Sequence, residues 1–333
     1  MAKQIISSVE WRGDHLEVID QTKLPGTLEL RSLDTVDDVV DAIRRLVVRG
    51  APAIGVCAAY GVAMGVAAGR DIDEVAAELT AARPTAVNLA WAVDRVVAAV
   101  RRGQDAFTEA QRIHDEDREA CRRIGELGRA ELDNITRVMT HCNTGRLATT
   151  GIGTALGVVY AKAQAGEDVE VMATETRPLL QGARLTAWEL ADAGIPVTLI
   201  SDAAAGAALH GRKVQAVVVG VDRVARNGDF ANKVGTYSLA VLARANGIPF
   251  YAVGPLSSFD PNTADGDTIE IEERSQDELR TLNGSQVAAD VTAWNPAFDV
   301  TPADLVTAFI TDVGVLRPPY ERSIAEALSR RVN

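Results

Sequence analysis

Apolar residues recur at every third or fourth position through most of the first 130 residues, a spacing typical of amphipathic helices. Asp34 or Thr35 is placed to cap the first of these helices, and Gly50 is placed to end it. The apolar series of this helix is Val36, Val39, Val40, Ile43, Leu46 and Val47. Further helices are predicted over residues 52–68, 84–103 and 105–133. Before all of them, Trp11–Pro25 alternates apolar and polar residues around a central glycine, which predicts a β-hairpin.

The pattern changes after residue 130, where short β-branched runs alternate with helical segments. Strands are predicted over residues 135–141, 169–174, 196–201, 214–220 and 249–254. The helical segments between them cover residues 153–165, 181–193, 203–210 and 235–245. Because strands that alternate with helices indicate βαβ units, we predict a parallel sheet with helices on both faces. A polar loop over 260–267 and a last strand over 305–311 complete this region.

These two patterns predict an α/β protein with two domains. Residues 1–130 are expected to form a smaller, mostly helical N-terminal domain that carries the short β segment. Residues 131–333 are expected to form the parallel-sheet C-terminal domain. The chain has 333 residues, of which 47% are hydrophobic, so it is long enough to build both cores.

Charge and cysteine usage narrow the classes of partner. The formal net charge is −12, which repels nucleic acid and anionic membranes, so neither is an expected partner. An anionic substrate would therefore need a local basic pocket. The three cysteines form no CxxC pair, and their odd number argues against a disulfide framework. Because there is no signal pattern, and because the apolar stretch 47–69 carries Arg49, we expect a cytoplasmic protein without a membrane span.

The fourth predicted strand ends in the most informative segment of the chain. A continuous valine run stops near Asp222, and a loop rich in glycine and asparagine continues to Lys233, just before a predicted helix. In parallel sheets ligands sit where strands end and helices begin, so both residues are placed to act on a small anionic molecule. An acid in apolar surroundings keeps its proton near neutral pH and can donate it. The alternative for Asp222 is an ion pair with Arg223 or Arg226.

Polar residues also follow the other predicted strands, and the ends of parallel strands meet at one edge of a sheet. These segments are His141-Cys142-Asn143-Thr144-Gly145, Glu175-Thr176-Arg177-Pro178 and Ser201-Asp202. We expect them to share a crevice, although helix caps and turns would use the same residue types. Cys142 is a candidate acid, base or polarisable stabiliser, with a buried, small hydrophobic residue as the alternative. His141 is expected to point to the opposite face of its strand.

Phosphate binding has three candidate positions, each at a predicted helix start. Gly50-Ala51 follows Arg49, Arg83 precedes a proline, and Lys233 precedes a Gly-Thr pair. Backbone N–H groups at a helix start favour anions, whereas an isolated arginine is most often a solvated surface charge.

Two further patterns are set aside. The glycine pattern over residues 151–157 has GxGxxxG spacing and lies about ten residues beyond its strand, so it fails the test for a dinucleotide site. The Glu272-Glu273-Arg274 cluster has no histidine or cysteine at ligand spacing, and we expect no metal ion.

Several longer motifs together resemble methylthioribose-1-phosphate isomerase, and the resemblance covers the chain from Trp11 to about Pro319. The wider family includes ribose-1,5-bisphosphate isomerase and the regulatory subunits of translation initiation factor two-B. The motifs are Arg49-Gly50-Ala51-Pro52-Ala53-Ile54-Gly55, Arg83-Pro84-Thr85-Ala86-Val87-Asn88, Thr140-His141-Cys142-Asn143, Glu175-Thr176-Arg177-Pro178, Gln181-Gly182-Ala183-Arg184-Leu185-Thr186, Gly220-Val221-Asp222-Arg223 and Asn232-Lys233-Val234-Gly235-Thr236.

The resemblance implies an aldose–ketose isomerase of methionine salvage, with a Rossmann-like C-terminal domain, no cofactor and a homodimeric state. It would convert 5-methylthioribose 1-phosphate, a small sugar phosphate, to 5-methylthioribulose 1-phosphate. By this resemblance Asp222 matches the proton donor, and Cys142 matches the position that stabilises the transition state. The substrate-binding positions that match are Arg49, Gly50, Ala51, Arg83, Gln181, Asn232 and Lys233. Departures from the family's common residues, which bear on fine substrate preference, are Thr144, Arg146 and Val221.

The chemistry itself leaves alternatives open. A sugar phosphorylated on C1 has no free anomeric hydroxyl, so an acid such as neutral Asp222 must protonate the ring oxygen before the ring opens. A hydrogen then moves from C2 to C1. Either a hydride shifts while Cys142 takes the 2-hydroxyl proton, or Cys142 removes the C2 proton and an enol forms. Ribose 1,5-bisphosphate and 5-deoxyribose 1-phosphate are alternative substrates, and a non-catalytic regulatory subunit is the alternative class.

Overall fold

The computed structural model describes residues 7–84, 86–282 and 284–331, and begins with a three-stranded antiparallel sheet. Its strands are β1 (Val9–Trp11), β2 (Leu16–Ile19) and β3 (Leu30–Leu33). The predicted hairpin is confirmed, because β1 pairs with β2 and Trp11 lies opposite Leu16. The third strand was not predicted.

Five helices follow this sheet. They are α1 (Val36–Arg44), α2 (Ala51–Ala67), α3 (Ile72–Thr80), α4 (Val87–Arg101) and α5 (Ala106–Glu131). Thr35 caps α1 through a capping box with Asp38, one of the two caps that the sequence allows. The prediction that α1 runs to Gly50 is wrong, because Leu46 adopts a positive φ of 59° that ends helical geometry. Helix α3 was not predicted.

The C-terminal region contains the predicted parallel sheet, with one antiparallel strand added at its edge. The strand order is β15-β14-β10-β7-β4-β5-β6, and only β15 runs antiparallel to its neighbour. The strands are β4 (Arg137–Thr140), β5 (Glu170–Thr174), β6 (Val197–Ile200), β7 (Ala216–Gly220), β10 (Phe250–Val253), β14 (Ala308–Ile310) and β15 (Val315–Leu316).

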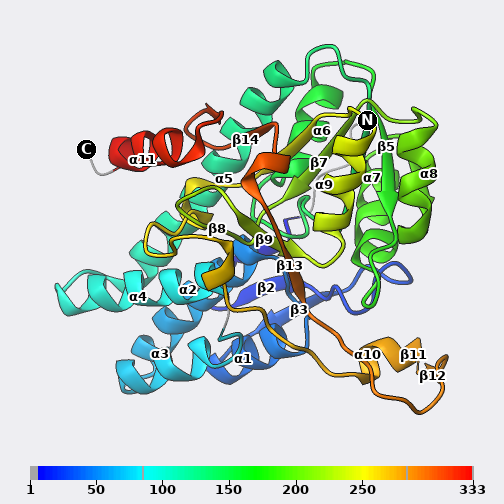
Figure 1. Ribbon diagram of the computed structural model, residues 1–333. Coiled ribbons are helices and arrows are strands. Elements are labelled where there is room, and N and C mark those ends of the chain that lie inside the picture. The colour runs from blue at the N-terminus through cyan, green and yellow to red at the C-terminus, as the bar shows by residue number, and fades with distance from the viewer. Residues whose placement is uncertain (1–6, 85, 283, 332–333) are drawn as a thin grey trace.

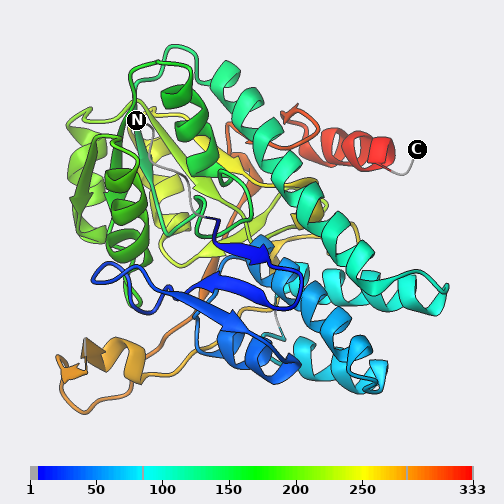
Figure 2. The same ribbon diagram turned by 180° about the vertical axis from the view of Figure 1, so that it is seen from behind.

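Helices cover both faces of this sheet, as predicted. Side chains of β7 alternate between the faces: Val217 and Val219 join one apolar cluster, and Ala216 and Val218 join the other. The first cluster includes α8 (Ala205–His210), α9 (Thr236–Ala245) and α11 (Tyr320–Arg331). The second includes α6 (Ala155–Gln164), α7 (Ala187–Asp192) and the end of α5. The long helix α5 runs along the back of the molecule from the N-terminal helices to the sheet (Figure 2).

A small antiparallel sheet lies beside the carboxyl edge of the main sheet. It pairs β8 (Arg223–Val224) and β13 (Phe298–Thr301) with the central β9 (Phe230–Lys233). Asn232 and Lys233 therefore lie on a strand rather than in the predicted loop. The segment between β10 and β13 also contains α10 (Asp277–Arg280), β11 (Thr281–Leu282) and β12 (Ser285–Gln286), which project from the body in Figure 1.

The site that matters for function lies where these regions meet. Helix α5 packs against α2 on one side and α6 on the other, so it joins the N-terminal helices to the main sheet. The division into domains near residue 130 stays a prediction. Within the residues that the structure describes, no helix is both long and apolar enough to cross a membrane.

Candidate active site

A cavity of about 130 Å³ lies between the start of α2 and the carboxyl ends of the central strands. It is lined by all nine residues that the sequence singled out: Arg49, Gly50, Ala51, Arg83, Cys142, Gln181, Asp222, Asn232 and Lys233. Cys142 and Asp222 thus face one space although eighty positions separate them along the chain. Their side chains come from the ends of β4 and β7, which are hydrogen-bonded neighbours in the sheet.

The start of α2 supplies backbone donors to this cavity. Gly50 adopts a φ of 97°, and a Cβ on it would lie 2.5 Å from the Cα of Ala148, so only glycine fits. The N–H groups of Gly50 and Ala51 donate no hydrogen bond to any described group, and Ala51 is the first of the 17 residues of α2. A helix start of this kind favours an anion.

Arg49 is held beside these N–H groups without a carboxylate partner among the described residues. Its guanidinium donates to the side-chain oxygen of Asn143 at 3.0 Å and to the Asn143 carbonyl at 2.8 Å. Both acceptors are neutral, so the full positive charge of Arg49 remains available to a ligand.

Cys142 lies where β4 ends, in a backbone conformation that is unusual for its residue type. Its φ is 61°, in the left-handed region. Two threonines fix it there: the Cys142 N–H donates to Thr176 Oγ1 at 2.9 Å, and Thr186 Oγ1 donates to the Cys142 carbonyl at 2.6 Å. The thiol is partly exposed and lines the cavity, unlike the two fully buried cysteines.

Asp222 follows β7 and presents a carboxyl group that accepts no hydrogen bond from the described residues. Burial raises the pKa of Asp222, and the nearby charges of Lys233, Arg83 and Arg49 offset only part of that rise. The alternative ion pair is not formed among the described residues, since Arg223 instead lies 3.9 Å from Asp260. The carboxyl is therefore placed to carry a proton into the cavity.

Lys233 and Asn232 enter the cavity from β9. The Lys233 ammonium donates to the Ala297 carbonyl at 2.7 Å and lies 4.5 Å from the centre of the Phe298 ring. Burial lowers the pKa of Lys233, against the opposing charges of Cys142 and Asp222. Asn232 is buried and donates to Thr236 Oγ1 at 2.9 Å, which ties it to the start of α9.

Arg83 and Gln181 complete the predicted set. Arg83 pairs with Glu272 at 3.1 Å, which joins the segment before α4 to the segment before α10. The Arg83 Nε, the Gln181 side-chain oxygen and the Ser258 hydroxyl are buried in the cavity wall with no partner among the described residues. Buried polar atoms of this kind are rare unless a ligand or water meets them, so the wall is built for a polar ligand.

The cavity is basic although the chain is acidic. Its lining includes two acidic side chains, Asp222 and Glu270, and five basic side chains: Arg49, Arg83, Arg223, Lys233 and Arg274. The sequence missed Ser258, Glu270, Arg274 and Phe298, all of which lie in the segment between β10 and the end of β13. The only sequence signal there is the Glu272-Glu273-Arg274 cluster, whose interpretation as a metal site was rejected for lack of histidine and cysteine.

Two parts of the predicted crevice are wrong, because neither Glu175-Thr176-Arg177-Pro178 nor Ser201-Asp202 lines the cavity. Asp202, at the end of β6, does not line the cavity; its carboxylate accepts the backbone N–H groups of Thr176 and Arg177, both at 2.7 Å. Asp202 thus stabilises the turn after β5, which is the alternative role that its residue type allowed. His141 also stays outside the cavity lining, buried between Thr174 and the Val234 carbonyl.

Comparisons with known proteins agree on one family. The model of the Initiation factor 2 subunit family matches residues 47–318. A methylthioribose-1-phosphate isomerase of Pelotomaculum thermopropionicum is 49% identical, over 98% of this chain and 96% of the relative. A 5-deoxyribose 1-phosphate isomerase of Moorella thermoacetica is 48% identical, over 97% of this chain and 98% of the relative.

Two solved structures extend the comparison to the fold. A 5-methylthioribose 1-phosphate isomerase from Pyrococcus horikoshii superposes with a TM-score of 0.91 at 41% identity, covering 100% of this chain and 98% of that one. A structure described as translation initiation factor eIF-2B, subunit delta, from A. fulgidus superposes with a TM-score of 0.86 at 42% identity. The match covers 98% of this chain and 100% of that one.

Proposed function

Because this chain belongs to the methylthioribose-1-phosphate isomerases within the Initiation factor 2 subunit family, we propose that it isomerises 5-methylthioribose 1-phosphate to 5-methylthioribulose 1-phosphate. This is an aldose–ketose isomerisation in methionine salvage. The observation that carries the proposal is the shared cavity, in which an acid with a raised pKa and a thiol lie among cationic side chains.

The phosphate of the substrate is assigned to the basic side of the cavity. The free N–H groups of Gly50 and Ala51 form an anion site at the start of α2. The guanidinium of Arg49, which has no carboxylate partner among the described residues, belongs to the same site. Lys233 and Arg83 add positive charge from the other walls. Asn232 and Gln181 then offer amide groups to the sugar hydroxyls.

Asp222 is the proposed proton donor to the ring oxygen. Burial raises its pKa and so favours the protonated carboxyl, and protonation of the ring oxygen lets the bond between C1 and that oxygen break. Cys142 then accepts a proton while a hydrogen is transferred from C2 to C1. It either takes the 2-hydroxyl proton during a hydride shift or removes the C2 proton on the route through an enol.

A second candidate substrate is 5-deoxyribose 1-phosphate, which the name of the Moorella relative favours. The cavity lining includes the apolar residues Ile54, Val87, Leu179, Val221 and Ile269. Apolar walls discriminate small groups only weakly, by about 1–3 kcal/mol for each methylene. A regulatory, non-catalytic role is disfavoured because such a subunit needs neither Asp222 nor Cys142. We further propose a cytoplasmic homodimer that needs no cofactor.

The test is a coupled assay of the purified protein on pentose 1-phosphates that carry methylthio, hydrogen or phosphate at C5, with the Asp222→Asn variant alongside. We expect turnover of the methylthio substrate without added cofactor. Asp222→Asn should bind that substrate normally but lose about 10²–10⁴ in kcat, the usual size of a general-acid contribution. No turnover of any of the three sugars would reject the function, and near-normal turnover by the variant would reject the acid.

A further inference from the structure

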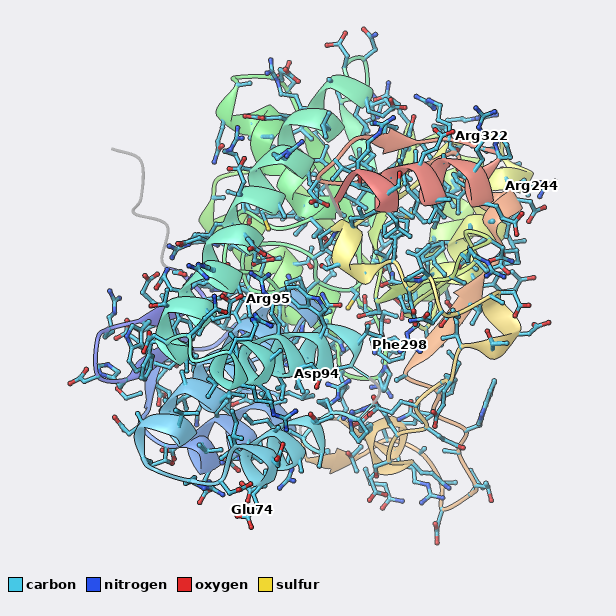
Figure 3. All side chains as sticks on the ribbon, turned by 90° about the vertical axis from the view of Figure 1, so that its left-hand side faces the viewer. Glu74, Asp94, Arg95, Arg244, Phe298 and Arg322 are labelled. Atoms are coloured by element: carbon cyan, nitrogen blue, oxygen red, sulfur yellow. The ribbon has the colours of Figure 1, made fainter. Side chains whose placement is uncertain are left out.

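Phe298 is the residue directly opposite Lys233 in the small antiparallel sheet. Strand β13 pairs with β9 so that these two residues share one register position. The Lys233 ammonium lies 4.5 Å from the centre of the Phe298 ring, and it donates to the carbonyl of the adjacent Ala297 at 2.7 Å. Phe298, labelled in Figure 3, begins strand β13 and lines the cavity.

The surroundings of Lys233 make this contact important. Among the described residues, its ammonium forms no ion pair with a carboxylate; its contacts are the Ala297 carbonyl and the Phe298 ring. The charged and titratable groups that face it are Asp222, Cys142, His141, Arg83, Arg274 and Asp299. Two of these are arginines, which repel the ammonium. Burial also lowers the pKa of Lys233, so the charged ammonium is stabilised less well here than in water and gains from any group that holds it.

An aromatic ring face attracts a cation without neutralising it. Its quadrupole holds the ammonium electrostatically, most strongly where water is excluded. A carboxylate in the same place would also hold Lys233 but would cancel the charge and repel a phosphate. The Ala297 carbonyl and the Phe298 ring together leave the positive charge of Lys233 available to the cavity.

We propose that Phe298 is a positioning residue of this site, whose ring face holds the Lys233 ammonium as a cation directed at the substrate phosphate. The proposal rests on the proposed function, because it takes a sugar phosphate as the ligand of Lys233. Phe298 acts through Lys233 and takes no part in proton transfer.

The experiment compares Phe298→Leu, which keeps an apolar side chain but removes the ring, with Phe298→Tyr, which keeps the ring. Steady-state kinetics and competitive inhibition by inorganic phosphate are measured from pH 6 to pH 9. In Phe298→Leu we expect KM and the phosphate inhibition constant to rise by about tenfold, with kcat nearly unchanged. The loss should grow with pH, because the lysine then deprotonates at a lower pH than in the wild type. Phe298→Tyr should restore the wild-type values.

Two controls separate this role from packing. Val300→Ala alters the same strand and the same small apolar cluster, but Val300 does not line the cavity. This variant should lose stability and keep its KM. In a Lys233→Gln background, Phe298→Leu should cause no further loss of phosphate binding, since the two residues act as one unit.

The outcomes are distinct. If Phe298→Leu keeps the wild-type KM and phosphate inhibition at every pH, or if kcat falls while KM holds, the proposal is overturned. An equal loss in the Lys233→Gln background overturns it as well. If the wild type turns over none of the sugars, the proposed function fails, but phosphate binding measured by calorimetry still tests Phe298.

Discussion

The Glu189→Gln variant tests how the loop between β4 and α6, which carries Cys142, is held in place. The Glu189 side chain is fully buried, and every hydrogen-bonding group around it is a donor. The Asn143 amide donates to Oε1, while the Arg146 N–H and the Tyr160 hydroxyl donate to Oε2 at 2.9 and 3.1 Å. Asn143 in turn accepts the Arg49 guanidinium. Burial raises the pKa of Glu189, but these donors favour the ionised form.

The magnitude follows from counting donors and acceptors. Glutamine has one acceptor oxygen, so its amide must turn an NH₂ group toward either the Asn143 amide or the two donors at Oε2. If Asn143 then flips, its own NH₂ faces Arg49. In each case a hydrogen bond to a charged group is lost, which is worth about 1.5–3 kcal/mol. We expect the free energy of unfolding to fall by about 2 kcal/mol and KM to rise about tenfold.

The matched control is Tyr160→Phe, which removes one donor from the same carboxylate and leaves the Asn143–Arg49 bond intact. Because this bond is also made to a charged group, the variant should lose about 1.5–3 kcal/mol of stability, with no change in KM. Urea unfolding gives the stability of each variant, and steady-state kinetics on the sugar phosphate give KM. If Glu189→Gln loses stability but binds substrate with wild-type KM, the loop is not held through Asn143, and the reasoning is refuted.

Two further predictions concern backbone fit and pH. In Gly50→Ala the new Cβ meets the Ala148 backbone at 2.5 Å with φ at 97°, so we expect a loss of about 2–4 kcal/mol and a much higher KM. Gly69→Ala, where φ is also positive but space is open, should cost about 1 kcal/mol and leave KM unchanged, and equal effects in both would contradict the clash. Burial lowers the pKa of His114 to about 4, so the unfolded chain binds the proton more tightly and stability is lost as pH falls from about 6.5 toward 4. Urea unfolding should show about 2 kcal/mol less stability at pH 5 than at pH 7 from this group, and His114→Gln should reduce that difference.

Local sequence patterns were sufficient to predict the elements whose main contacts are made by residues close in the chain. Thr35 caps α1 through a residue three positions away, and the β7 valines are buried on both faces wherever the strand sits. Helix α3 was equally readable, with Asp71 as its cap and Val75 and Leu79 on its buried side, but its signal was overlooked. These features depend on spacing and residue type alone.

Sequence patterns gave the wrong structure where a partner distant in the chain determines the conformation. Asn232 lies in a stretch whose glycines and polar residues indicate a loop, yet it forms a strand because β13 pairs with it from 67 positions away, with Asp299 opposite. Asp202 and Asp222 both follow predicted strands and look alike in sequence. The Asp202 carboxylate accepts hydrogen bonds from N–H groups of the turn after β5, whereas the Asp222 carboxyl lines the cavity without such a donor among the described residues. The position of that turn therefore decides which of the two acids is available to a ligand.

The same dependence on distant contacts explains why the cavity residues meet at all. Three contacts from the N-terminal region converge on the loop between β4 and α6: Ser8 donates to the Thr149 carbonyl, Gln21 to the Leu147 carbonyl at 2.7 Å, and the Ala53 N–H to the Ala148 carbonyl at 3.1 Å. The start of this loop carries Cys142. The free N–H groups of α2 and the thiol are thus placed by one segment, so a change there must disturb binding and turnover together.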